Sequence, residues 1–154
     1  MAAQETSRLK THDKTLVVHH NGRLIGGLAL LYLAASLLHF AHNAEYLSDY
    51  PNLPLWLSRG DIYFAWSGLA ALGITGYMLY RMGRQLSGLC LLGIYAAFGF
   101  DGLLHYTRAP VAAHSAAMNF TIWFEVAAAA ALLMAVLAQV ANRLRHHVAE
   151  RGGI

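Results

Sequence analysis

The chain has 154 residues, of which 57% are hydrophobic and only 12% are charged, and its formal net charge is +3. Soluble domains carry roughly 25% charged residues. This composition therefore excludes an ordinary water-soluble domain and predicts a surface that faces lipid. The basic residues flank the apolar segments instead of forming one patch. That pattern excludes a nucleic-acid-binding protein and is typical of topology signals in a membrane protein.

Four apolar stretches reach the length of about 20 residues that an α-helix needs to cross a bilayer. They cover residues 24–43, 62–80, 86–105 and 115–141. The sequence therefore predicts an all-α fold, a bundle of four transmembrane helices within residues 24–142. A polar segment, residues 1–23, precedes this domain, and a basic tail, residues 143–154, follows it. Residues 44–61 form the loop between the first two spans.

Lysine and arginine predict the orientation of these spans, because cytoplasmic segments of membrane proteins are enriched in both. Nine of the 11 basic residues lie in the two terminal segments and in the connection between the second and third spans. The opposite side has only Arg59 and Arg108. This bias places both termini in the cytoplasm. The alanine-rich, short-looped sequence favours the inner membrane of a bacterium. Its many small residues allow helices to approach closely, which suits a compact bundle, a homo-oligomer or a subunit of a larger membrane complex.

Polar residues inside apolar spans are costly and usually face the interior of a bundle, where they mark functional sites. Residues three or four apart share one face of a helix. On the first span such a face holds His39, His42, Asn43 and Tyr46, with Glu45 beside it. On the third span Asp101 and His105 are separated by four residues.

The remaining two spans also carry polar or aromatic faces. On the fourth span one face holds His114, Met118, Thr121 and Glu125, with Asn119 next to it. On the second span Tyr63 and Trp66 share a face and are expected to form part of a pocket wall. The ionisable groups all fall in the predicted outward half of the spans, which favours one shared pocket.

The first hypothesis for this pocket is a transition-metal site, because bundles build metal sites from side chains on facing helices. Its predicted ligands are His39, His42, Asp101, His105, His114 and Glu125. Imidazole and carboxylate ligands suit zinc, iron or manganese, and Met118 would favour copper. Glu125 and Asp101 are then the candidate catalytic groups, acting as ligand or general base on a lipid-like or small hydrophobic substrate.

Two alternatives involve different chemistry. In the first, haem b is held between two histidines on different spans, such as His39 and His105, within an electron-transfer subunit that interacts with a quinone. In the second, no cofactor is present, and the polar residues bind a small ligand, relay protons or belong to a structural subunit of a membrane complex. Neither alternative fixes a reaction, so enzyme activity is left open.

The predicted orientation can be tested with reporter fusions. A reporter that functions only in the cytoplasm should be active when it is fused after Ile154. A tag inserted within residues 44–61 should react with an externally added reagent that cannot cross the membrane. Activity of the Ile154 fusion on the outer side would contradict the orientation.

Overall fold

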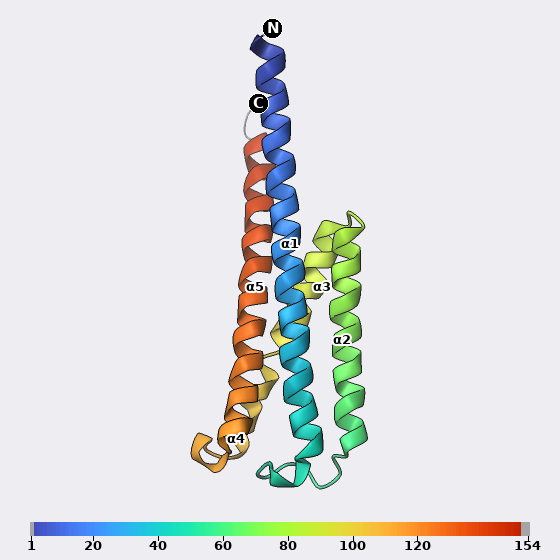
Figure 1. Cartoon of the computed structure of the whole chain (residues 1–154), viewed down its shortest axis with the longest axis vertical. Coiled ribbons are helices and arrows are strands. Elements are labelled where there is room, and N and C mark those ends of the chain that lie inside the picture. The colour runs from blue at the N-terminus through green and yellow to red at the C-terminus, as the bar shows by residue number, and fades with distance from the viewer. Residues whose placement is uncertain (1, 152–154) are drawn as a thin grey trace.

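The computed structural model describes residues 2–151, and it describes side chains for residues 22–145 and 148. Within this part the chain is all-helical and has no strand. The α-helices, labelled in Figure 1, are α1 (Ala2–Glu45), α2 (Arg59–Arg81), α3 (Gln85–Phe98), α4 (His105–Arg108) and α5 (Ala116–Arg151). Short 3-10 helices occupy the connections: η1 (Leu47–Asp49), η2 (Asp101–Leu104) and η3 (Val111–Ala113).

Four of the described segments are long and apolar enough to cross a bilayer, which confirms the predicted number of candidate spans. They are Gly22–Glu45, Arg59–Arg81, Gln85–Arg108 and Ala116–Arg145. Each begins or ends a few residues outside the predicted stretch. Helix α1 also continues backwards through most of the polar N-terminal segment, so the helix is longer than its apolar part.

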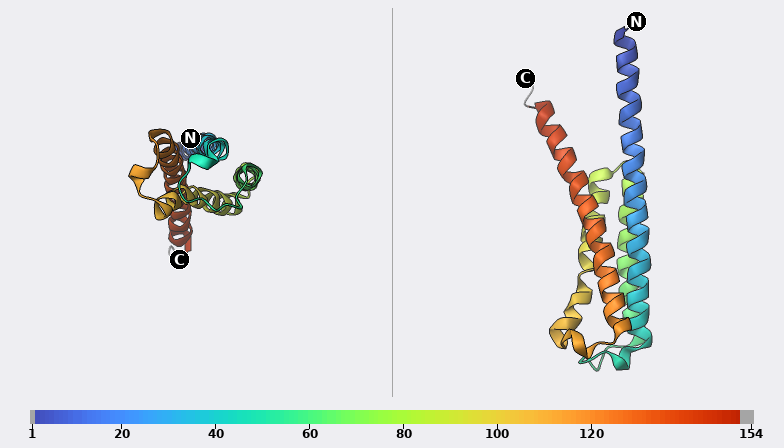
Figure 2. Two further views of the ribbon diagram at one scale, coloured as in Figure 1. Left: turned by 90° about the horizontal axis from the view of Figure 1, so that it is seen from below. Right: turned by 60° about the vertical axis from the view of Figure 1, so that its left-hand side comes forward.

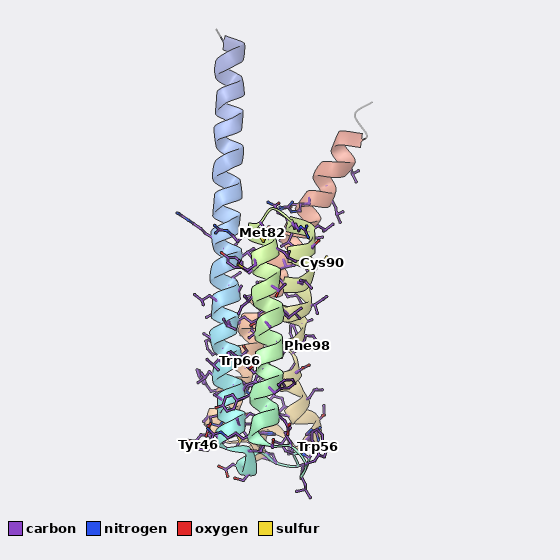
Figure 3. All side chains as sticks on the ribbon, turned by 90° about the vertical axis from the view of Figure 1, so that its right-hand side faces the viewer. Tyr46, Trp56, Trp66, Met82, Cys90 and Phe98 are labelled. Atoms are coloured by element: carbon purple, nitrogen blue, oxygen red, sulfur yellow. The ribbon has the colours of Figure 1, made fainter. Side chains whose placement is uncertain are left out.

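The four long helices form a closed, antiparallel bundle. Helix α1 packs against α2 and α5, and α3 packs against the same two helices. Figure 2 shows α1 and α5 diverging where they project beyond the other helices. We call the end formed by residues 46–58 and 109–115 the loop end, and the end at residues 82–84 the turn end. Tyr46 and Trp56 lie toward the loop end, and Met82 and Cys90 toward the turn end (Figure 3).

The third span is not one continuous α-helix, which corrects the prediction that Asp101 and His105 share a helical face. Helix α3 ends at Phe98, and the chain turns before η2 and α4. At this break the backbone lies against the neighbouring helices. A Cβ atom on Gly99 would be 2.4 Å from Ala129 Cβ and 2.7 Å from the Tyr32 ring. The helical periodicity used in the prediction therefore ends before Asp101.

The core lies between the turn end and the middle of the bundle. Its fully buried side chains include Tyr32, Leu89, Leu92, Tyr95 and Leu132. The rings of Tyr32 and Tyr95 pack with centroids 4.4 Å apart. In a membrane, where lipid is as apolar as these side chains, close packing rather than exclusion of water would hold the helices together here.

At the turn end, one glycine permits a tight turn and another permits close contact between two helices. Gly83 has a φ of +87°, a conformation that glycine adopts without steric cost, and Arg84 N donates to Leu79 O across the turn at 3.0 Å. Gly88 lies directly against the backbone of α2, where an added Cβ would be 2.4 Å from Tyr80 N and 2.7 Å from Tyr80 Cα. Because backbone atoms cannot rotate away, any side chain at Gly88 must push α2 and α3 apart.

Gly88→Ala should therefore destabilise the bundle by about 1–3 kcal/mol, the usual cost of overpacking. The matched control is Gly68→Ala on α2, because a Cβ there would meet nothing within 4 Å. Denaturant-induced unfolding in detergent micelles would measure both variants. Equal stability of the two variants would contradict the close packing of α2 on α3.

Candidate functional site

The loop end of the bundle contains a cluster of polar side chains, which we call the histidine cluster: His39, His42, His105, His114 and Glu125. Four of them are almost completely buried, with exposed fractions of 3% for His39, 8% for His105, 5% for His114 and 1% for Glu125. They come from α1, from α4, from the end of η3 and from α5. The structure thus brings together five of the predicted site residues, which lie far apart in the sequence.

His39 and Glu125 form the deepest pair. Their Nε2 and Oε2 atoms are 3.7 Å apart. On the other side of the ring, His39 Nδ1 lies 3.3 Å from Thr121 Oγ1, and that hydroxyl donates to Met118 O at 3.0 Å. Because Thr121 has one hydroxyl proton, and Met118 accepts it, the Nδ1–H group of His39 must donate to Thr121. In a neutral ring the lone pair of Nε2 then faces Glu125.

Gly102 leaves space beside this pair. A Cβ atom on Gly102 would lie 3.6 Å from Glu125 Oε2 and 3.8 Å from His39 Nε2. The backbone of η2 at this position therefore lies close to both the carboxyl group and the imidazole ring. Met118, a predicted pocket residue, is buried one helical turn before Thr121. Its carbonyl group accepts the hydrogen bond from the Thr121 hydroxyl.

His105 links the pair to the rest of the cluster. Its ring centroid is 5.5 Å from that of His39 and 6.1 Å from that of His114. Asn43, a predicted pocket residue on α1, places Nδ2 at 3.3 Å from His105 Nε2. If Nδ2 donates, Nε2 accepts, and the proton of a neutral His105 ring is carried by Nδ1.

His114 is positioned by the connection that precedes α5. Its Nδ1–H donates to Pro110 O at 3.1 Å, which leaves the lone pair of Nε2 directed elsewhere. Asn119 holds the same connection through Nδ2, which donates to His114 O and Val111 O, each at 3.2 Å. Tyr106 in turn donates to Asn119 Oδ1 at 2.7 Å. The predicted pocket residue Asn119 is therefore a positioning residue.

Tyr50 was not predicted as part of the site, because it lies in residues 44–61, which were interpreted as the loop between the first two spans. It is buried, its hydroxyl lies 2.9 Å from His42 Nδ1, and its ring centroid is 4.9 Å from that of His105. Burial raises the pKa of the Tyr50 hydroxyl to about 12. The hydroxyl therefore keeps its proton at neutral pH and can donate it to His42.

Four buried atoms in and beside the cluster have no hydrogen-bond partner among the described residues. They are Asn43 Oδ1, His105 Nδ1, His114 Nε2 and Glu125 Oε2. Folded proteins rarely leave buried polar atoms unpaired. Several such atoms in one place indicate a site for something polar: exchangeable protons, water, an ion or a small ligand.

Asp101 does not belong to the cluster, although it was predicted as a ligand and a catalytic group. Its side chain is exposed at the surface of the chain. The physical reason is the break after α3. Since Asp101 begins a 3-10 helix instead of continuing α3, Gly102 takes the position that faces His39 and Glu125.

Four predicted pocket residues also lie outside the cluster. Glu45 is at the surface, where Oε1 is 2.7 Å from Arg59 Nη2 and accepts from the Tyr63 hydroxyl at 2.8 Å. Glu45 and Tyr63 thus join α1 to α2. Tyr46 is largely exposed, and its ring packs against that of His42 with centroids 4.7 Å apart. Trp66 Nε1 donates to Ser36 Oγ at 3.3 Å, another contact between helices.

The two connections at the loop end are tied to each other. Asn52 Nδ2 donates to Arg108 O at 2.9 Å, and Arg108 Nη1 donates to Asn52 O at 3.5 Å. Asn52 has a φ of +57°, which asparagine tolerates better than most residues. Both partners are exposed, so these bonds close the cluster from outside without forming part of it.

The six predicted metal ligands do not form a complete metal centre as they lie. Among the side chains that the structure describes, those of residues 22–145 and 148, no three His, Cys, Asp or Glu groups lie so that they could hold one metal ion. His39 and Glu125 are an acid and a base in near contact, next to three more imidazoles. Imidazole and carboxyl groups are the side chains that most often accept and donate protons near neutral pH. No protein-family model, curated protein or solved structure matches this chain.

Proposed function

We propose that this chain is an integral membrane protein that takes up a proton from its loop end onto the buried pair His39–Glu125. The near contact of these two groups, 3.7 Å apart and almost completely buried, carries the proposal. An ionised carboxylate or imidazolium deep in a bundle is costly unless a partner compensates it. With one proton between them, the pair has zero net charge whichever group holds it.

The orientation of His39 suits this role. Thr121 accepts from Nδ1–H, so the basic nitrogen of the neutral ring faces Glu125. A protonated Glu125 can then transfer its proton to Nε2, and the reverse transfer restores the neutral pair. At 3.7 Å the transfer needs a small closure or one bridging water, because hydrogen bonds of this type are shorter than about 3.2 Å.

The cluster extends from this pair in one direction only. Toward the loop end, the ring of His105 lies beside that of His39, and the rings of Tyr50 and His114 both lie beside that of His105, at centroid distances of 4.9–6.1 Å. Toward the turn end, the buried side chains among the described residues include the hydroxyl groups of Tyr32 and Tyr95 but no acidic or basic group. The geometry therefore supports a proton site loaded from one side rather than a path across the membrane, and it favours coupling of proton uptake to a bound ligand or partner.

Infrared difference spectra of the protein in lipid vesicles, titrated between about pH 4 and pH 10 where carboxyl and imidazole groups exchange protons, test this proposal. The wild type should show a pH-dependent carbonyl band of a protonated carboxylic acid, and Glu125→Gln should abolish it. Asp49→Asn is the matched control, because this carboxyl group is exposed and lies in η1, outside the candidate spans. Thr121→Val should shift the midpoint of the Glu125 band, because it removes the hydroxyl group that fixes the His39 ring. Thr107→Val should not, because Thr107 is exposed and its hydroxyl donates to Leu104 O.

A pH-dependent band that survives Glu125→Gln would assign the signal to another carboxyl group and contradict the proposal. So would a folded wild-type protein whose infrared spectrum contains no titrating buried carboxyl group.

A transition-metal site is a second candidate, favoured by the hydrogen bonds of the histidine rings. Metal-bound histidines usually donate their second N–H group to an oxygen atom, which fixes the ring. His39 donates to Thr121 and His114 donates to Pro110 O, and the remaining Nε2 atom of His114 has no hydrogen-bond partner. Together with Glu125, these residues would hold the metal, provided that they move closer than they lie now.

Elemental analysis of the purified protein, together with its visible spectrum, separates the two candidates. A metal site should give about one metal ion per chain, with metal lost in His39→Ala and His114→Ala and retained in Asp101→Asn. A Soret band would instead support haem b. Protein that contains neither metal nor haem, purified without chelator, would exclude the second candidate and leave the proton site.

A further inference from the structure

A groove at the turn end, far from the histidine cluster, lies between α1 and α2 and has a volume of about 480 Å³. We call it the α1–α2 groove. Its floor includes Gly26, Gly27 and Gly73, and apolar side chains such as Leu30 and Ile74 form its sides. The volume lies in the usual range for sites of small molecules, about 300–1,000 Å³. Leu30 and Ile74 are more than half exposed, so the groove opens to the surrounding lipid.

Two arginines stand at one end of this groove. Arg23 begins the first candidate span and Arg81 ends the second, so the antiparallel packing of α1 and α2 brings both to the turn end. Tyr77 adds a hydroxyl group between the helices, 2.7 Å from where a Cβ atom of Gly26 would lie. None of the described residues that line the groove is acidic. The groove thus combines a cationic end with an apolar body.

We propose that the α1–α2 groove binds a phospholipid with an anionic headgroup. Arginine binds phosphate through paired N–H donors, and basic pockets between transmembrane helices are known to hold anionic headgroups. The two arginines would bind the phosphate at the level of the membrane surface. An acyl chain would lie along α1 from Gly27 to Leu33. Arg23 and Leu33 are ten residues apart, or about 15 Å along a helix, so headgroup and chain are both accommodated.

Gly27 allows the groove to be blocked without disturbing the bundle. A Cβ atom at Gly27 would meet nothing within 4 Å, whereas one at Gly26 would collide with Tyr77. Gly27→Leu should therefore fill the groove and leave both arginines in place. Arg23→Gln/Arg81→Gln does the opposite, because it keeps the groove and removes its charge. Both arginine side chains are exposed, so neither variant should unfold the protein.

Native mass spectrometry of the full chain in detergent, with phosphatidylglycerol or phosphatidylcholine of the same acyl chains added, tests the proposal. The wild type should prefer phosphatidylglycerol. Arg23→Gln/Arg81→Gln should reduce that preference about tenfold or more, because each basic residue near an anionic headgroup contributes about 1 kcal/mol to binding. Gly27→Leu should weaken binding of both lipids. Arg84→Gln/Arg145→Gln, which removes equal charge without touching the groove, and Gly68→Leu should bind as the wild type does.

Three results would overturn the proposal. Equal binding of the two lipids to the wild type would remove the role of the arginines. Binding of glycerol phosphate as tight as that of the intact lipid would remove the role of the groove. A change in oligomeric state caused by Gly27→Leu would assign the groove to a contact between copies of the chain.

Discussion

A carboxyl group deep in an apolar bundle must find its partners within the protein, because lipid offers no hydrogen bonds and solvates charge poorly. Glu125 imposes this requirement on the loop end. Its neighbour His39 needs Thr121 to fix its ring, and Thr121 needs the Met118 carbonyl as acceptor. The break after α3 brings Gly102 and His105 against the same pair. One buried acid thus explains why polar side chains from several segments converge.

The two ends of the bundle follow different physical rules. At the turn end, contacts between glycine and tyrosine allow the helices to pack closely, as Gly88 against Tyr80 and Gly73 against Tyr95 show. At the loop end, hydrogen bonds determine the arrangement, and several buried atoms are left without partners. Close packing fixes one geometry, whereas unpaired polar atoms favour rearrangement when protons or ligands arrive. The bundle is therefore expected to be more rigid at its turn end.

The sequence predicted the features that depend on length and helical periodicity. Apolar length revealed the four candidate spans, and the spacing of His39, Thr121 and Glu125 placed them on inward faces. The prediction failed at Asp101 because the backbone leaves α-helical geometry after Phe98, and periodicity contains no sign of that break. Glu45 was misplaced because its partner, Arg59, begins the next helix. Tyr50 was missed because loop conformation, unlike helical register, has no regular pattern in the sequence.

The hydrogen bonds between Asn52 and Arg108 affect the cover of the histidine cluster more than the folding stability of the bundle. They lie at the surface, where each contributes at most about 1 kcal/mol to folding, yet they join the two segments that cover the histidine cluster. Substitutions at these two residues are therefore expected to loosen the cover of the cluster while leaving the close packing of the helices unchanged. In this arrangement, access to the cluster and the durability of the scaffold would depend on different residues.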